Sequence, residues 1–139
     1  MSTYKIAQVK KTYDGTSAQV WDALVNPVKV KQYFFGTDME SSWEVGDYIY
    51  FRGEYNDKAY EDKGIITDFE QEKLLAYNYR SSWSQTEDTP ENYLPVRFEL
   101  ESSGGNTTLT ITQSCFTEEE AKDSEKNWKQ AMEQMQEVI

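Results

Sequence analysis

The sequence of 139 residues contains no histidine and a single cysteine, Cys115. Without histidine, the chain cannot supply a Ser-His-Asp triad, a Cys-His pair or a His-ligated zinc site from its own residues. With one cysteine it cannot form an intrachain disulfide. We expect Cys115 to be a buried strand residue, because a free cysteine behaves as a small hydrophobic side chain. The sequence therefore assigns no catalytic residue, no cofactor and no metal.

Positive charge and long apolar segments are also scarce. Lysine and arginine total 14 against 25 aspartates and glutamates, which gives a net charge of −11. Nucleic acids and anionic membrane surfaces attract cationic groups, so both are disfavoured as partners. The first residues lack the apolar core of a signal peptide, and no segment approaches the roughly 18 apolar residues of a membrane span. We therefore expect a cytoplasmic protein that binds neither nucleic acid nor membrane.

The N-terminal part of the sequence predicts one strand and two short helices. Residues Tyr4–Tyr13 alternate loosely between apolar and polar, which is typical of a strand. Thr16 and Gln19 have the spacing of a capping box at a helix start. Pro27 ends that helix and opens a second one over Val28–Phe34, because proline at the first helical position removes an N–H that would be unpaired anyway.

The centre of the chain predicts a series of antiparallel strands joined by turns. Alternating apolar and polar residues mark the expected strands, which are Tyr48–Tyr55, Lys58–Phe69, the run from Leu75 to Arg80, Tyr93–Glu101 and Thr107–Phe116. The longest loop, from Arg80 to Glu91, carries Trp83. That tryptophan either folds back onto the protein or belongs to a binding surface.

The C-terminal residues predict one long amphipathic helix. Thr117 and Glu120 form a second capping box, and no glycine or proline follows them. One apolar stripe recurs at helical spacing and consists of Ala121, Trp128, Ala131, Met132, Met135 and Ile139. Because strands and helices are segregated, the fold class is α+β. We expect a curved antiparallel sheet of about six or seven strands, wrapped around this helix in a single domain over residues 1–139.

Several segments resemble the START-like (SRPBCC) superfamily. They are Val20-Trp21-Asp22-Ala23-Leu24, Trp43-x-Val45-Gly46-Asp47, Gly64-Ile65-Ile66 with Lys73-Leu74-Leu75, Val96-Arg97-Phe98-Glu99-Leu100, Thr107-Thr108-Leu109-Thr110-Ile111-Thr112, and Trp128 in the final helix. Within it the chain is similar to the group named after the C-terminal domain of the activator of the ninety-kilodalton heat-shock chaperone's ATPase. Asn127 departs from the glycine that this group often has before the helix tryptophan. The resemblance implies a helix-grip fold with an apolar-ligand cavity between sheet and terminal helix.

The residues that we expect to line this cavity come from the helices and the strands. They are Phe51, Tyr77, Tyr79, Phe98, Trp128, Met132 and Met135, with Tyr33 and Phe34 at the mouth. Methionine adapts to irregular shapes, and tyrosine hydroxyls can orient a ligand. The same side chains can instead fill a solid core, and the sequence leaves both interpretations open.

Three functional hypotheses follow. The first is a binding module for a small apolar molecule, and the second is a regulator of a heat-shock chaperone ATPase, with the chaperone protein as partner. The third is a cyclase- or hydrolase-like enzyme, favoured only if a buried carboxylate or tyrosine points into a cavity. The carboxylates considered for such a role fall mostly at strand ends or in turns and are Asp47, Glu54, Asp57, Glu61, Asp62, Asp68 and Glu70. The protein is expected to be a monomer or a homodimer.

Overall fold

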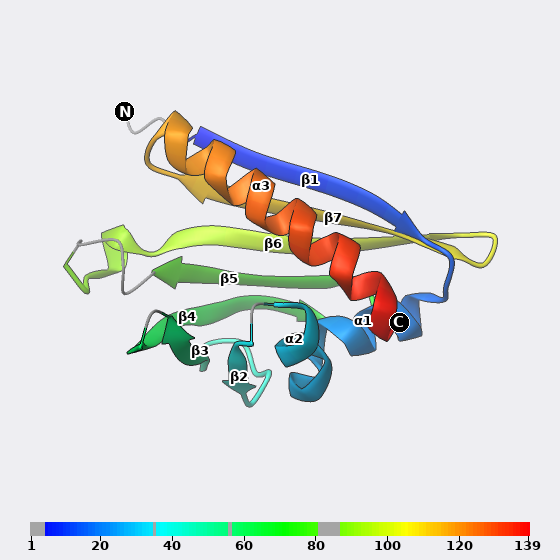
Figure 1. Ribbon diagram of the computed structural model, residues 1–139, viewed down its shortest axis with the longest axis horizontal. Coiled ribbons are helices and arrows are strands. Elements are labelled where there is room, and N and C mark those ends of the chain that lie inside the picture. The colour runs from blue at the N-terminus through cyan, green and yellow to red at the C-terminus, as the bar shows by residue number, and fades with distance from the viewer. Residues whose placement is uncertain (1–4, 35, 56, 81–86) are drawn as a thin grey trace.

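Seven antiparallel strands form one sheet in a computed structural model of the chain, which describes residues 5–34, 36–55, 57–80 and 87–139 (Figure 1). In chain order they are β1 (Lys5–Tyr13), β2 (Asp38–Ser41), β3 (Tyr48–Tyr55), β4 (Lys58–Glu70), β5 (Leu74–Arg80), β6 (Leu94–Ser103) and β7 (Asn106–Cys115). The spatial order is β1-β7-β6-β5-β4-β3-β2, so β2 to β7 form a meander and β1 pairs with β7. The α+β class and the curved antiparallel sheet are thereby confirmed.

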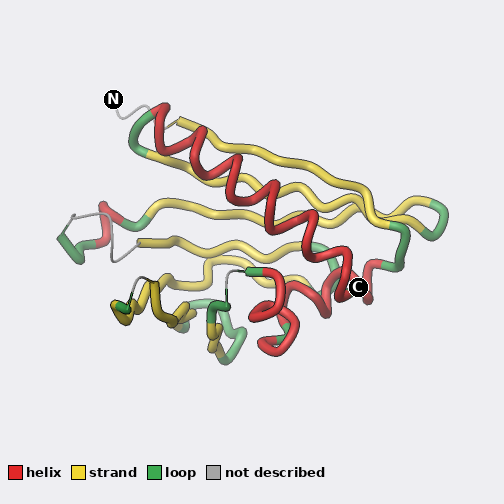
Figure 2. Tube along the Cα trace, in the orientation of Figure 1, coloured by secondary structure: helices red, strands yellow, loops and turns green. Residues whose placement is uncertain are grey.

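The helices complete the predicted helix-grip arrangement. They are α1 (Ser17–Val25), α2 (Pro27–Tyr33) and α3 (Glu118–Met135), with 3-10 turns η1 (Pro90–Asn92) and η2 (Gln136–Val138). Figures 1 and 2 show α3 running along β1 and β7, with its C-terminal end close to α2. No helix in the described part of the chain offers an apolar stretch of the length that crossing a bilayer needs.

Side-chain caps fix the starts of α1 and α3. At α1 the predicted capping box is present: Thr16 Oγ1 accepts the Gln19 N–H at 3.2 Å, and Gln19 Oε1 accepts the Thr16 N–H at 2.9 Å. At α3, Thr117 Oγ1 accepts the Glu120 N–H at 3.1 Å. The Glu120 carboxylate, however, accepts the N–H of Phe116 instead of that of Thr117. Each cap of this kind stabilises a helix by about 1 kcal/mol.

The sheet buries one face against the helices. In β7 the alternation places Leu109 and Ile111 inside, while Thr108 and Thr110 are only partly buried. Strand β2 is an addition to the prediction. Its four residues pair with β3, which sets Met39 opposite Phe51 and adds a buried methionine to the core.

Helix α3 is held against the sheet by its apolar stripe and, towards β1, by two long-range hydrogen bonds. Ala131, Met132 and Met135 are at most 3% exposed, and each fully buried methionine contributes about 1.5 to 3 kcal/mol. The Tyr13 hydroxyl on β1 donates to the Met132 carbonyl oxygen at 2.7 Å. The Gln8 N–H donates to a carboxylate oxygen of Glu125 at 3.1 Å. The helix position relative to β1 is therefore fixed at two points.

Candidate functional site

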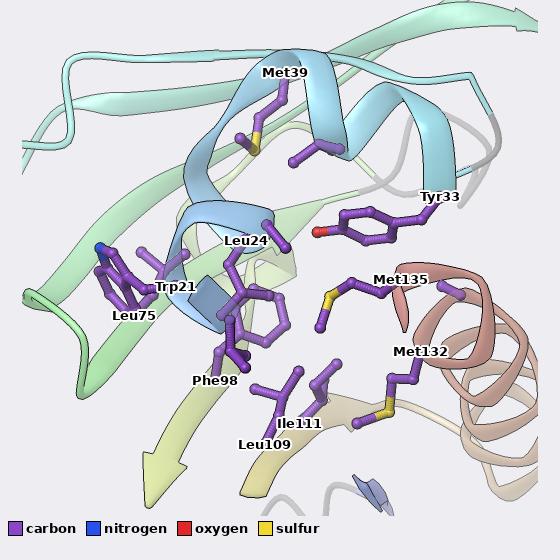
Figure 3. Packing of buried hydrophobic residues seen from close by; sticks show 14 of the residues in the cluster. Trp21, Leu24, Tyr33, Met39, Leu75, Phe98, Leu109, Ile111, Met132 and Met135 are labelled. Carbon is purple, nitrogen blue, oxygen red and sulfur yellow. The ribbon is translucent and has the colours of Figure 1, made fainter. Parts of the chain in front are cut away.

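A cavity lies between α2, α3 and the inner face of the sheet. Its volume is about 30 Å³. All the empty space between its wall atoms, including the part open to solvent, amounts to about 450 Å³. Its wall consists of Leu24, Val30, Tyr33, Phe34, Met39, Ile49, Phe51, Leu75, Tyr77, Phe98, Ile111, Trp128, Ala131, Met132 and Met135. Among the residues that the structure describes, no charged side chain belongs to this wall. Figure 3 shows the side chains of Tyr33, Met132 and Met135 directed towards the centre of this cluster.

The enclosed space is small compared with known ligand cavities. An engineered apolar cavity of ~150 Å³ in another protein binds benzene. The enclosed 30 Å³ here is well below that volume. As it stands, the cavity therefore accommodates a water-sized occupant, and a ring-sized ligand requires the wall to move.

Two half-buried aromatic rings form the mouth of the cavity. Phe34 and Trp128 are stacked, with ring centroids 5.1 Å apart and an interplanar angle of 17°. Trp128 also packs edge-on against Phe98, and its Nε1–H donates to Gln113 Oε1 at 2.7 Å. Phe34 caps the seven-residue helix α2 and donates its N–H to the Val30 carbonyl oxygen. Trp128 is thus held by a side-chain hydrogen bond, and Phe34 also packs edge-on against Phe51, with ring centroids 6.4 Å apart.

Two tyrosine hydroxyls supply the polarity inside the cavity. Tyr33 on α2 is 6% exposed and Tyr77 on β5 is 3% exposed, and both line the wall. Neither hydroxyl forms a hydrogen bond with another residue in the described part of the chain. No fully enclosed side-chain oxygen or nitrogen among the described residues lacks a partner, so each of these hydroxyls keeps some accessible surface, and both residues line the cavity.

Burial keeps both phenols neutral. It raises the pKa of Tyr77 far above the ordinary value of 10. The pKa of Tyr33 is raised mainly by burial and further by the neighbouring phenols of Tyr77 and Tyr13. Removing a group from water disfavours its charged form, and no cation lines the cavity to offset that loss. Both hydroxyls are therefore hydrogen-bond donors and acceptors at physiological pH.

Comparison with known proteins places this architecture in a family. Residues 14–139 match the family described as Activator of Hsp90 ATPase homolog 1-like protein. The chain is also 39% identical to the protein ChR145 from Cytophaga hutchinsonii, whose solution structure superimposes with a TM-score of 0.83 over 98% of this chain and 94% of that chain. This chain belongs to the Activator of Hsp90 ATPase homolog 1-like family. The predicted membership of the START-like superfamily is confirmed.

More distant structures share the fold of this family member. Mll3558 from Rhizobium loti is 18% identical, with a TM-score of 0.79 over 99% of this chain and 98% of that chain. The Aha1 dimer from Colwellia psychrerythraea is 14% identical, with a TM-score of 0.74 over 97% of this chain and 96% of that chain. At these identities the likeness concerns the fold alone. No curated protein matches the sequence.

In this member of the family, eight of the nine predicted lining residues lie in the cavity wall. Tyr79 is the exception. Its hydroxyl donates to Asp62 Oδ2 at 2.6 Å, and its ring packs against Phe51 outside the wall. The cause is strand register, because Tyr79 pairs with Gly64, and Asp62 is the diagonal neighbour on the same face of β4. Tyr33 was also expected at the mouth, yet its side chain is buried in the interior.

The rest of the wall was not predicted as part of the site. These residues are Leu24, Val30, Met39, Ile49, Leu75, Ile111 and Ala131. The inward alternation of Ile49 and Ile111 was a usable signal, whereas Met39 lies on the unpredicted β2. Trp83 falls outside the described residues.

None of the carboxylates considered for catalysis lines the cavity. Six of the seven are exposed, and only Asp62 is buried, at 7% exposure. Asp62 accepts the Tyr79 hydroxyl and does not line the cavity. Among the described residues, no cluster of three or more cysteine, aspartate or glutamate side chains is arranged to hold a metal ion.

Proposed function

We propose that this protein is a binding module for a small, predominantly hydrophobic molecule held between the sheet and α3. The observation that carries the proposal is an apolar wall, uncharged among the described residues, in which the stacked rings of Phe34 and Trp128 are the partly exposed members. Ligand sites in proteins are typically apolar cavities with a few convergent polar groups. The hydroxyls of Tyr33 and Tyr77 supply such groups here.

Entry of a ligand requires the stacked rings to separate. An aromatic pair contributes about 0.5 to 1.5 kcal/mol beyond its buried area. A ring-sized ligand that buries roughly 150 to 250 Å² gains about 4 to 6 kcal/mol at 25 cal/mol per Å². Burial therefore outweighs the loss of the stack. Because association itself costs several kcal/mol, we expect only weak binding of a ligand of one or two rings.

The direct test uses the methionines of the wall. Tetralin is titrated into the full chain labelled with ¹³C at the methionine methyl groups, and the NMR signals of Met39, Met132 and Met135 are followed. All three line the cavity, so saturable shifts in all of them are expected. Native mass spectrometry of freshly purified protein checks for a retained molecule. Unshifted methyl signals up to the solubility limit of tetralin would contradict the proposal.

A filled cavity provides the matched control. Ala131 is 1% exposed and lies in the wall, so Ala131→Leu adds three carbons to the enclosed space. Circular dichroism establishes that the variant is folded. Tetralin is then expected to bind at least several-fold more weakly to Ala131→Leu than to the original chain.

Family membership supports a second candidate, contact with a heat-shock chaperone. The net charge of −11 favours a basic surface on such a partner. The test is the ATPase rate of a purified ninety-kilodalton chaperone with and without the protein at low and high salt. An unchanged rate would remove this candidate. Whether the protein is a monomer or a homodimer can be read from the same native mass spectra, and its cytoplasmic location stays a prediction.

An enzymatic function is less well supported. The cavity contains buried tyrosines, which was the stated condition for considering it. General acid–base catalysis needs a group with a pKa near the working pH, however, and burial moves the pKa of Tyr33 and Tyr77 away from it. The cavity wall contains no carboxylate that could act as their partner.

A further inference from the structure

The two cavity hydroxyls differ from the other polar groups around them. The Tyr13 hydroxyl donates to the Met132 carbonyl oxygen, and the Trp128 Nε1–H donates to Gln113. The Tyr33 and Tyr77 hydroxyls have no such partner in the described part of the chain, although both residues are more than nine-tenths buried. Buried polar groups in folded proteins are nearly always hydrogen-bonded. Two exceptions in one cavity point to a partner that enters from the cavity itself.

Packing alone does not explain why these positions are tyrosines. The Tyr77 ring lies 5.7 Å from that of Phe51 and 5.8 Å from that of Phe98, measured between centroids. Both neighbours fill the same wall with a plain phenyl ring. A phenylalanine in place of Tyr77 would keep the ring contacts and avoid the cost of desolvating a hydroxyl. The hydroxyl is therefore dispensable for the core.

The chemistry of the wall restricts what the two hydroxyls can bind. A carboxylate or an ammonium group would lose its hydration without meeting an opposite charge, since none of the described residues that line the cavity is charged. Neutral phenols donate well to a carbonyl oxygen, which offers two lone pairs. Tyr33 and Tyr77 come from α2 and β5, so a single oxygen between them would also link the helix to the sheet.

We propose that Tyr33 and Tyr77 together bind the oxygen acceptor of a neutral ligand, such as a ketone or ester carbonyl on a body of one or two rings. This inference rests on the proposed ligand-binding function and adds the chemical class of the ligand. Phe34 and Trp128 would cover the apolar body, while the carbonyl points inward. The experiment must therefore separate recognition of the carbonyl from apolar binding.

The probes are 1-tetralone and tetralin, which have the same ring skeleton and differ in the carbonyl group. Both are titrated into the full chain, with the methyl signals of Met132 and Met135 as the readout. The measured quantity is the ratio of the two dissociation constants, tetralin over 1-tetralone. Two net hydrogen bonds raise this ratio, and we expect it to fall at least about tenfold in the double variant Tyr33→Phe, Tyr77→Phe. Tetralin itself should bind the double variant as well as it binds the original chain.

Tyr79→Phe is the matched control, because the Tyr79 hydroxyl bonds Asp62 and lies outside the wall. Its ratio should equal that of the original chain. If both probes bind but the ratio is the same in all variants, the carbonyl assignment is wrong while the binding function stands. If neither probe binds the original chain, both proposals are wrong.

An infrared measurement on the original chain makes the test independent of the variants. The carbonyl stretch of bound 1-tetralone, isolated by isotope difference, is compared with its frequency in an alkane and in water. Hydrogen bonds from two phenols lower the frequency below the alkane value. A bound carbonyl at the alkane frequency would overturn the assignment whether or not the double variant folds.

Discussion

Raising the pH above 10 is expected to unfold this protein steeply, because three phenols are deeply buried. Burial raises the pKa values of Tyr13, Tyr33 and Tyr77 well above 10. Above that pH the unfolded chain releases protons that the folded chain retains. The stability that these groups provide is thus fully present below pH 10 and is lost as the pH rises towards their folded pKa values.

The magnitude follows from the number of buried phenols. Each contributes a slope of about 1.4 kcal/mol per pH unit, so three give about 4 kcal/mol per pH unit above pH 10. A protein of ordinary stability, about 5 to 15 kcal/mol, then loses the lower value within little more than one unit. Burial also raises the pKa of the Cys115 thiol, which adds a loss of the same sign. That term is present in every variant and cancels when variants are compared.

The assay is denaturant unfolding followed by circular dichroism at several pH values between 9 and 11.5. Phenolate absorbance near 295 nm reports ionisation in parallel. The double variant Tyr33→Phe, Tyr77→Phe should reduce the slope of unfolding free energy against pH by about 3 kcal/mol per unit. Tyr48→Phe, at a tyrosine that is 47% exposed, is the surface control. Equal slopes in the double variant and the original chain, or complete ionisation with native dichroism, would refute the reasoning.

Four further substitutions, one of them a control, test the fold and the cavity. Gly64→Ala would push the new Cβ into the Asn78 carbonyl oxygen on the neighbouring strand, so we expect thermal unfolding to show a loss of stability of about 3 kcal/mol or more. Gly104→Ala is the control. Its new Cβ meets no neighbouring atom, and its φ of +59° should cost only about 1 to 2 kcal/mol of stability. Thr16→Ala removes the capping box of α1 and should cost about 1 kcal/mol in denaturant unfolding, and no loss would contradict the cap assignment. Met132→Ala should lower the stability by about 2 to 5 kcal/mol and enlarge the cavity. Tetralin is therefore expected to bind this variant more tightly. Weaker binding would show that the ligand lies elsewhere.

The sequence contained most of the fold because local signals agreed with one another. The stripe that includes Trp128, Met132 and Met135 predicted which side of α3 meets the sheet, and the Thr16 cap marked the start of α1. Strand β2 escaped prediction because four residues are too few for a periodicity. Its pairing with β3 is a tertiary contact, which alternation within the chain does not encode.

For the site, the sequence predicted the direction of side chains better than their partners. Period-two alternation turned Tyr77 and Phe98 inward, and the structure places both in the cavity wall. The same alternation places the Tyr79 ring against Phe51, but its hydroxyl bonds Asp62, a partner set by the register between β4 and β5. Long-range hydrogen bonds were not predicted: the Tyr13 hydroxyl donates to a helix carbonyl oxygen, whereas the Tyr77 hydroxyl has no protein partner in the described part of the chain.

Packing and binding make opposite demands on the two cavity hydroxyls, and this opposition separates a solid core from a ligand site. In a solid core, an unpaired buried hydroxyl only costs free energy, about 1 to 3 kcal/mol before any water is considered. Tyr33→Phe should then raise the free energy of unfolding at pH 7 by about 1 kcal/mol and change nothing else. In a ligand site, the same substitution should raise stability and also weaken binding of a carbonyl compound. The cost that the free protein bears at Tyr33 and Tyr77 is the free energy that the ligand's acceptor recovers, so the two effects should appear together.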